Sequence, residues 1–435
     1  MTLRLTFGAA VAALVAVSCS PQDPGAPKPA EEAAATLKHN HFTGALEIDP
    51  QAGTLAADWT ITVIEPQLES ITYLLNRSYE DIRVGGDVTG YELVEAEIFD
   101  QQIWNIVIQL KPASGVHRKI NISYGGELLP EPMENRINTI SPDKVELTVD
   151  SLWHPFDGRF TEQVTADFRV DIPGEWTGVT NGSAELDVDG GWRFSTAPGL
   201  DIPVTLLGKF RKTDAPGYVI YDTRETSDSL PELVESTAAC TSYLNDRFGD
   251  VDPLPEAKIV VHDREQSGYS RKTLIALSKI SGRDKSRLMQ FICHELAHYW
   301  SMRGAANTVE NWLNETFADY VALMAVREHM GQDVFESFLA RYRQQLDEAG
   351  DLPPIWTPEN QERGPYLVQY RKGPLALATL EERLGRDLFA QFVHRYMTEE
   401  IATTPALLEA LEDVAGADAR AQFEMDLAQT GRKEK

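Results

Sequence analysis

The chain reads Phe-Ile-Cys-His-Glu-Leu-Ala-His at residues 291–298, and this stretch predicts a helix that presents a metal site. His294 and His298 are four residues apart, so both imidazoles project from one helix face, one turn apart. Apolar residues recur at helical spacing around them, with Asp284 as a start signal and Gly304 as a stop signal. Glu295 lies between the two histidines, where it can act as general base on a metal-activated water. The alternative is a buried helix whose histidines pair with backbone groups or carboxylates.

A third zinc ligand is expected, because a catalytic zinc takes three protein ligands and leaves a position for water. Apolar residues at helical spacing predict a second helix from residue 311, ended by Gly331. Glu315 is the candidate third ligand, and Asp319, one turn later, can accept a hydrogen bond from a liganding histidine. Without the histidine pair, each carboxylate would indicate only a solvated helix face. The sequence therefore predicts one zinc ion per chain.

These residues resemble the zinc signature of the aminopeptidase N and leukotriene hydrolase family of gluzincins. The likeness covers His-Glu-Leu-Ala-His-Tyr-Trp at 294–300, Trp-Leu-Asn-Glu at 312–315, and Tyr-Arg-Lys-Gly at 370–373, which matches the family's Tyr-x-Lys-Gly segment. The resemblance implies that His294, His298 and Glu315 hold the zinc and that Glu295 is the general base. It also implies that the hydroxyl of Tyr370 stabilises the oxyanion, with Tyr366, four residues earlier, as the alternative.

The chain departs from the family in two places. Sixteen residues separate His298 from Glu315, two fewer than the family usually has, which implies a shortened loop at 304–309. The family's Gly-x-Met-Glu-Asn strand, whose glutamate holds a substrate's free amino group, should precede the zinc helix. That position reads Gly-Tyr-Ser-Arg-Lys, which makes Gly268 and Arg271 the candidate substrate-binding residues. A cationic amine would prefer an anion there.

The N-terminus indicates export. Residues 1–18 contain one Arg and a short apolar run, as in a signal peptide. Ala-Val-Ser-Cys at 16–19 resembles a bacterial lipoprotein box, which implies lipidation of Cys19 and a membrane anchor; an ordinary signal peptide is the alternative. Residues 19–37, rich in Pro, then form a flexible tether. No Asp follows Cys19, and by the sorting rule of bacterial lipoproteins this implies anchoring in the outer membrane. The folded part would then face the periplasm or the surface.

Residues 38–212 predict an N-terminal β domain. Apolar residues alternate with period two in several runs, among them 59–63, 104–110, 120–124 and 168–172. Gly, Pro, Asn and Asp clusters separate these runs, which favours an antiparallel β-sandwich or saddle. The resemblance implies that this domain forms one wall of the cleft.

Residues 213–435 predict a thermolysin-like catalytic domain, mixed α/β first and helical at its end. Strands are expected at 218–221 and 258–262, and helices at 230–248, 372–384, 387–397 and 405–414. The expected fold class is therefore α+β and multidomain. The resemblance further implies that the helical C-terminal domain of longer relatives is absent, which would leave a more open cleft.

The composition fits an exported enzyme. The formal net charge is -27, from 40 Lys and Arg against 67 Asp and Glu, so nucleic acid is not an expected partner. Besides Cys19 the chain has Cys240 and Cys293, each on an apolar helical stretch. They could form a disulfide, but we interpret both as small core residues.

The sequence thus predicts zinc-dependent hydrolysis of peptides, most simply by an aminopeptidase. An endopeptidase, or a hydrolase for N-blocked peptides in which Arg271 or Lys272 grips a substrate carboxylate or carbonyl, is the alternative raised by the missing Met-Glu-Asn. A non-catalytic surface lipoprotein that binds peptides is the third possibility.

Overall fold

A computed structural model of the chain describes residues 37–98, 100–113, 115, 117–131, 136–265 and 268–430. The expected signal peptide, Cys19 and all but the last residue of the expected tether lie outside these ranges. Residues 38–435 form one compact unit. Within the described ranges, no helix is both long and apolar enough to cross a membrane.

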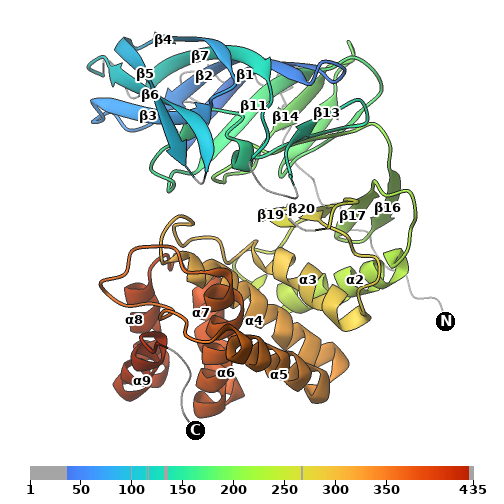
Figure 1. Cartoon of the computed structure of the whole chain (residues 1–435), viewed down its shortest axis with the longest axis vertical. Helices are drawn as coiled ribbons and strands as arrows, with labels where there is room; N and C mark the ends of the chain where they lie inside the picture. The colour runs from blue at the N-terminus through green and yellow to red at the C-terminus, as the bar shows by residue number, and fades with distance from the viewer. Residues whose placement is uncertain are drawn as a thin grey trace, which may run out of the picture. The chain divides into compact units, whose positions relative to one another are not determined.

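The first half of the compact unit is built from β-strands, as the period-two pattern predicts (Figure 1). Its largest sheet has seven strands in the order β13-β14-β11-β1-β2-β7-β4. Their bounds are Ser183–Leu186, Trp192–Ser195, Val164–Asp171, Asn40–Asp49, Thr54–Val63, Arg118–Glu127 and Glu80–Gly86. The expectation of purely antiparallel pairing is wrong for β1 and β11, which pair in parallel. More than a hundred residues separate these strands, enough for the crossover that parallel pairing needs.

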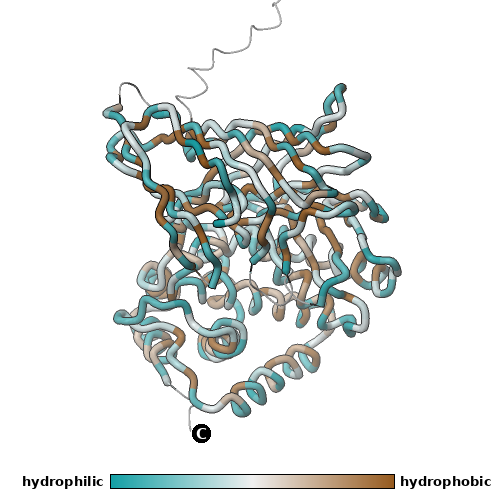
Figure 2. The backbone as a smooth tube through the Cα atoms, turned by 45° about the horizontal axis from the view of Figure 1, so that its top comes forward, coloured by the Kyte–Doolittle hydropathy of each residue, from teal (hydrophilic) through white to brown (hydrophobic). Residues whose placement is uncertain are grey.

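Two four-stranded sheets complete this β region. One has the order β10-β3-β6-β5 and the other β12-β15-β9-β8. The first comprises Phe156–Asp157, Ser70–Asn76, Gln101–Leu110 and Val88–Ile98, and the second Thr177–Val179, Val204–Leu207, Lys144–Leu147 and Thr139–Ile140. Hydrophobic and hydrophilic residues alternate along many strands (Figure 2). The inward apolar side chains form one core around Trp59, Phe168 and Trp153.

A five-stranded sheet opens the second half, in the order β16-β17-β18-β20-β19. The strands span Arg211–Ala215, Tyr218–Asp222, Ala257–Val261, Leu274–Leu277 and Tyr269–Arg271. The three central strands are parallel and the two outer strands are antiparallel to them. Strand β19 is therefore a free edge next to the predicted zinc helix.

Helices pack below this sheet in Figure 1 and share one core with it. They are α2 to α9, at Leu230–Phe248, Lys285–Ala297, Asn311–Met330, Gln332–Ala349, Gly373–Leu384, Arg386–Thr398, Thr404–Ala415 and Ala417–Leu427. The predicted helices are confirmed. The expected stop at Gly304 is wrong, since α3 already ends at Ala297. Gly304 instead packs so closely on the Glu310 carbonyl that an added Cβ would lie 2.4 Å from its oxygen.

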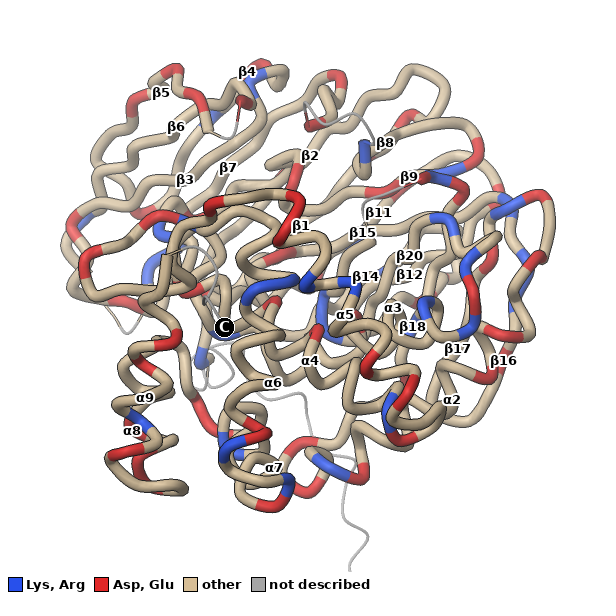
Figure 3. Tube along the Cα trace, turned by 60° about the horizontal axis from the view of Figure 1, so that its bottom comes forward, with Lys and Arg blue, Asp and Glu red and all other residues tan. Residues whose placement is uncertain are grey.

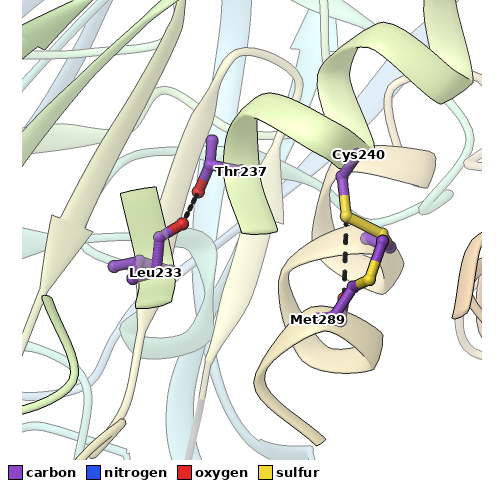
Figure 4. The surroundings of a disulfide bond; sticks show 5 residues. Leu233, Thr237, Cys240 and Met289 are labelled. Atoms are coloured by element: carbon purple, nitrogen blue, oxygen red, sulfur yellow. Dashed lines mark hydrogen bonds between the residues drawn. A yellow bond between two sulfur atoms is a disulfide. The ribbon is translucent and has the colours of Figure 1, made fainter. Parts of the chain in front are cut away.

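The interpretation of Cys240 and Cys293 as separate core residues is wrong. Both are fully buried, but they form a disulfide that joins α2 to α3, with their Cα atoms 5.3 Å apart (Figure 4). The sulfur of Cys240 also lies 3.7 Å from the carbonyl oxygen of Met289 on α3. Helical spacing alone could not show that the two helices bring these side chains together.

Candidate active site

Helix α3 carries the predicted histidine pair. The side chain of Asp284 accepts a hydrogen bond from the Arg287 amide and caps the helix, as predicted. Fully buried Leu288, Ile292 and Leu296 hold one side of the helix in the core. His294 and His298 are also buried, at 6% exposure each, and their ring centroids lie 4.7 Å apart. The helix therefore presents both imidazoles at one shielded position.

Helix α4 brings Glu315 to the same position. The Nε2 atoms of His294 and His298 are 3.1 Å apart, and Glu315 Oε2 lies 3.5 Å from the first and 3.4 Å from the second. Bonds of about 2.0–2.1 Å to a tetrahedral zinc place its ligand atoms about 3.3 Å apart. Glu315 Oε2 is buried, and no donor in the described part of the chain hydrogen-bonds to it. The three side chains thus have the spacing and chemistry to hold one zinc ion.

The electrostatics of this triad favour positive charge. Burial lowers the pKa of His294, but the interaction with Glu315 and the charge of Glu295 outweigh it and raise that pKa to about 9. Burial would raise the pKa of Glu315, yet His298 and His294 hold it well below its usual range. A site that stabilises a proton between an imidazole and a carboxylate also suits a cation that replaces the proton.

Glu295 follows His294 on α3 and is equally buried. Burial raises the pKa of its carboxyl, while His294 and His298 act in the opposite direction. A raised pKa is suited to a general base, because such a carboxylate takes up a proton more readily than an exposed one.

Asp319 lies one turn after Glu315, as predicted. Its Oδ1 is 3.9 Å from Nδ1 of His294, too far for a direct hydrogen bond. Tyr342 donates to its Oδ2 at 2.8 Å and Gln290 donates to its Oδ1. The carboxylate is therefore fixed behind the histidine, and a shift of about 1 Å would bring the pair into contact.

Tyr370 lies on a π-helical turn, Val368–Lys372, between α5 and α6. Its ring centroid is 5.6 Å from that of His294. Burial raises the pKa of its hydroxyl well above the ordinary value, and the charge of Glu315 raises it further. Tyr366, the alternative oxyanion donor, is 57% exposed, and its hydroxyl accepts a hydrogen bond from Arg371. Tyr370 is therefore the tyrosine that lies against the histidine pair.

Close packing ties this turn to α4. The hydroxyl of Thr316, next to Glu315, donates to the carbonyl of Gln369 at 2.6 Å. A Cβ on Gly373 would lie 2.1 Å from the same hydroxyl oxygen, so only glycine fits there. The ligand helix and the tyrosine turn are thus in direct contact. Sequence reasoning missed Thr316, since nothing local marks it as a partner of a segment 53 residues away.

Gly268 and Arg271 lie at the predicted edge strand. A Cβ on Gly268 would approach the Phe291 ring of α3 to 2.7 Å, so this glycine permits the strand to lie close to the zinc helix. The Arg271 guanidinium is held by two carboxylates, with Nε 2.7 Å from Asp201 and Nη2 2.9 Å from Asp150. Its charge still acts on Glu295. Lys272 extends elsewhere, over the Tyr299 ring at 5.6 Å.

The acids that hold Arg271 come from the β region, and sequence reasoning did not identify them. Asp201 also lies 3.5 Å from His154, a buried histidine of the same region. Next to them Glu146, which is fully buried, accepts two hydrogen bonds from Arg264 at 3.0 and 2.8 Å and one from the Tyr269 hydroxyl. Sequence separations of 70 to 123 residues leave no local signal for these contacts.

A His-Glu-x-x-His helix, a glutamate from the following helix and a mixed five-stranded sheet define the fold class of the gluzincin metallopeptidases. Residues 266–426 match the peptidase family M1 domain. The chain therefore carries a domain of peptidase family M1.

Two curated relatives agree with this family. Aminopeptidase 2 of Candida albicans is 29% identical over 225 residues, covering 46% of this chain and 24% of the relative. Probable aminopeptidase 2 of Sulfurisphaera tokodaii is 26% identical over 176 residues, which cover 36% of this chain and 22% of the relative. The chain thus spans about a quarter of the length of these curated relatives.

Solved structures share the whole fold. An M1 zinc metallopeptidase from Deinococcus radiodurans superposes with a TM-score of 0.71 at 18% identity, over 90% of this chain and 93% of that one. Leukotriene A4 hydrolase from Saccharomyces cerevisiae superposes with a TM-score of 0.67 at 14% identity, over 90% of this chain and 68% of that one. The expected fold class, an all-β region followed by a thermolysin-like domain, is confirmed.

Proposed function

We propose that the chain is a zinc-dependent peptidase, most simply an aminopeptidase, with one zinc ion held by His294, His298 and Glu315. The observation that carries the proposal is the triangle of ligand atoms, with sides of 3.1 to 3.5 Å, which adjoins the buried Glu295 and the half-buried Tyr370. A purely structural pairing of two histidines and a glutamate would not need a base and a phenol beside it.

In this mechanism, a bound zinc ion supplies Lewis acidity and makes water nucleophilic at neutral pH. Glu295 takes the proton of the attacking water and delivers it to the leaving amine. The hydroxyl of Tyr370 donates to the oxyanion that develops on the scissile carbonyl. Asp319 lies behind His294, where a shift of about 1 Å would let it accept a hydrogen bond and orient the ring.

The aminopeptidase assignment draws on the two curated relatives, which are named as aminopeptidases, and on a mutant of the Deinococcus enzyme solved with a Tyr-Ser-Ala substrate. One observation favours a second candidate, an endopeptidase or a hydrolase of N-blocked peptides. Asp150 and Asp201, the acids at the β19 edge, are both bound to Arg271. A free α-amine would have to compete with that guanidinium.

Mass spectrometry of peptide mixtures tests the proposal. Wild-type protein and Glu295→Gln, both loaded with zinc, would be incubated with free and N-acetylated peptides. We expect single residues to be lost from free N-termini, at a rate at least about 10³-fold lower in Glu295→Gln, and abolished by a chelator in the wild type.

Internal cuts, or cleavage of acetylated peptides, would establish the second candidate. Equal rates in the wild type and Glu295→Gln would contradict the role of Glu295. No cleavage by a protein with stoichiometric zinc would refute the peptidase proposal and favour the non-catalytic lipoprotein that binds peptides.

We also propose that the protein is exported and anchored by lipid at Cys19, on the basis of the apolar run and the Ala-Val-Ser-Cys motif. Mass spectrometry of the N-terminal fragment from membranes would show a diacylglyceryl modification on Cys19. In Cys19→Ser the protein should leave the membrane fraction, and a membrane-bound Cys19→Ser variant would contradict the anchor.

A further inference from the structure

Arg371 is next to the proposed oxyanion donor, and within the described residues its hydrogen bonds all go to neutral acceptors. Its Nε donates to Gln345 Oε1 at 2.6 Å, Nη1 to the carbonyl of Tyr370 at 2.6 Å, and Nη2 to the hydroxyl of Tyr366 at 2.8 Å. The guanidinium also lies over the Tyr342 ring, 4.3 Å from its centroid. Aromatic faces stabilise a cation without neutralising it.

No described Asp or Glu forms an ion pair with Arg371, in contrast to Arg271, Arg264 and Arg327. Asp319 feels its charge, but that carboxylate is bound by Tyr342 and Gln290 instead. A guanidinium has five N–H donors, so two remain available on Arg371. The side chain is thus a fixed, charged donor with no anionic partner in the described structure.

The position of Arg371 places it within reach of a bound substrate. The Tyr366 ring stacks on Tyr370 at 4.6 Å, Tyr370 lies 5.6 Å from the His294 ring, and Arg371 lies 5.2 Å from the Tyr366 ring. This path corresponds to at most about four or five residues of extended peptide. Tyr366 is 57% exposed, so solvent reaches this side of the tyrosine pair.

A second cation, Arg363, comes three residues before Tyr366 in the chain. Arg363 is exposed and forms no ion pair with another described residue. Burial and Glu315 raise the pKa of Tyr370, and Arg363 acts against them, so its charge reaches the tyrosine hydroxyl. The chain as a whole has a net charge of -27, and its acidic residues are distributed over its strands and helices (Figure 3).

We propose that Arg371 and Arg363 form a carboxylate-binding subsite on the exposed side of Tyr370 and Tyr366. A planar fork matches a carboxylate geometrically, and a charge-assisted pair is stronger than a neutral one. The carboxylate belongs to the peptide, either as the C-terminus of a short substrate or as an Asp or Glu side chain. This identification of the ligand depends on the proposed peptidase function, whereas the subsite itself is tested by binding.

Calorimetry on the zinc-loaded Glu295→Gln protein separates the two sources. One pair of ligands is Leu-Ala-Ala and its C-terminal amide, and the other is Glu-Ala-Ala-amide and Gln-Ala-Ala-amide. In at least one pair, we expect the peptide that carries the carboxylate to bind roughly 10- to 100-fold more tightly than the peptide in which an amide replaces it. The pair that shows the difference identifies the source of the carboxylate.

Arg371→Gln, introduced into the Glu295→Gln protein, should reduce that preference to about twofold or less. Arg371→Lys keeps the charge but not the planar pair of donors, so it should reduce the preference partly. Arg363→Gln changes an exposed side chain and should reduce it several-fold without affecting the fold. Arg341→Gln is the matched control, because Arg341 also stacks near Tyr342, at 5.9 Å, but no contact joins it to Tyr366 or Tyr370 in the described structure.

Equal affinities within both pairs, or a preference that survives Arg371→Gln and Arg363→Gln, would overturn the subsite. Failure of all four peptides to bind at millimolar concentration would overturn it as well. These outcomes are independent of the peptidase proposal, which fails only if wild-type protein with bound zinc cleaves no peptide.

Discussion

Individual residues of the proposed site differ in how far sequence could predict them. His294 and His298 are four residues apart at the end of one helix, so helical periodicity alone places both imidazoles on one face, and Glu295 follows the first of them directly. Glu315 was the candidate ligand on the second predicted helix and Tyr370 was expected through a family resemblance, and the structure brings both to the histidine pair. Their catalytic roles stay predictions. Asp150 and Asp201 could not be predicted, because only the tertiary fold brings these acids to Arg271.

The variant Tyr370→Phe tests the proposed role of the Tyr370 hydroxyl as the oxyanion donor. Loss of one hydroxyl aimed at a developing negative charge should lower kcat by about 10²- to 10³-fold. Zinc content and the unfolding midpoint should not change, because the ring and its packing remain. Steady-state kinetics with metal analysis on the same sample would measure both.

Tyr299→Phe is the matched control, since the Tyr299 hydroxyl bonds to Asp252 at 3.1 Å and not to any group of the triad. Full turnover in Tyr370→Phe would assign the oxyanion to another donor.

Secondary-structure elements were predicted well where apolar periodicity is strong. Helices α2, α3 and α4 and strands β2, β6, β7 and β11 lie where the pattern indicated. The π-helical turn at Val368–Lys372 was not predicted, since the expected helix began at residue 372. A π-helical turn is short and rare, so no simple sequence pattern marks it. The disulfide was missed for a different reason, since it depends on how α2 packs against α3.

Gly373→Ala tests the contact between the tyrosine turn and α4. The added methyl would meet the Thr316 hydroxyl, and the turn would have to move. We expect a loss of roughly 1–3 kcal/mol in the free energy of unfolding, together with reduced kcat, since Tyr370 moves with the turn. Denaturant unfolding and kinetics on one preparation would measure the two effects.

Gly364→Ala serves as the comparison, because a Cβ there meets its nearest neighbour at 3.5 Å, an ordinary contact. If Gly373→Ala is as stable and active as Gly364→Ala, the close approach is not needed.

The disulfide between α2 and α3 should contribute to stability through the unfolded chain. It closes a segment of 53 residues, for which chain entropy gives roughly 4 kcal/mol. Urea unfolding of the wild type and of a Cys240→Ala, Cys293→Ala double variant should therefore differ by about 2–4 kcal/mol. An identical free energy of unfolding in the two proteins would show that the pair is not oxidised or not stabilising.

At the scale of the whole molecule, sequence predicted two domains with a boundary near residue 212, and that boundary stays a prediction. The structure adds the buried charged network around Glu146. Burial would raise the pKa of Glu146, but the charges of His262, Lys144 and Arg264 outweigh it and hold the pKa well below its usual range. Burial lowers the pKa of His262, so we assign the main effect to Lys144 and Arg264.

Glu146→Gln should therefore destabilise the protein in a pH-dependent manner. The folded state holds Glu146 ionised below the pKa of the unfolded chain, so its stabilisation is complete above about pH 5 and is lost as pH falls towards the folded pKa. Removing one partner of a buried ion network costs roughly 3–5 kcal/mol at pH 7. The difference in the free energy of unfolding between wild type and Glu146→Gln should decrease by up to about 1.4 kcal/mol per pH unit below pH 4.5.

Urea titrations between pH 7 and pH 3 would measure this difference. Asp143→Asn is the control, because its ion pair with Lys209 is exposed and should contribute less than about 1 kcal/mol at any pH. A difference that is constant with pH would mean that folding does not shift the pKa of Glu146.

The two ion pairs that hold Arg271 have a consequence for experiments that divide the chain into fragments. Its guanidinium belongs to the C-terminal half, whereas the two carboxylates that hold it belong to the N-terminal half. Separating the chain at residue 212 would leave Arg271 without its acids in the C-terminal fragment, and Asp150 and Asp201 without their arginine in the N-terminal one. It would also separate Glu146 from Arg264. Neither half is then expected to express as a stable protein alone, whereas co-expression of both could restore a working pair.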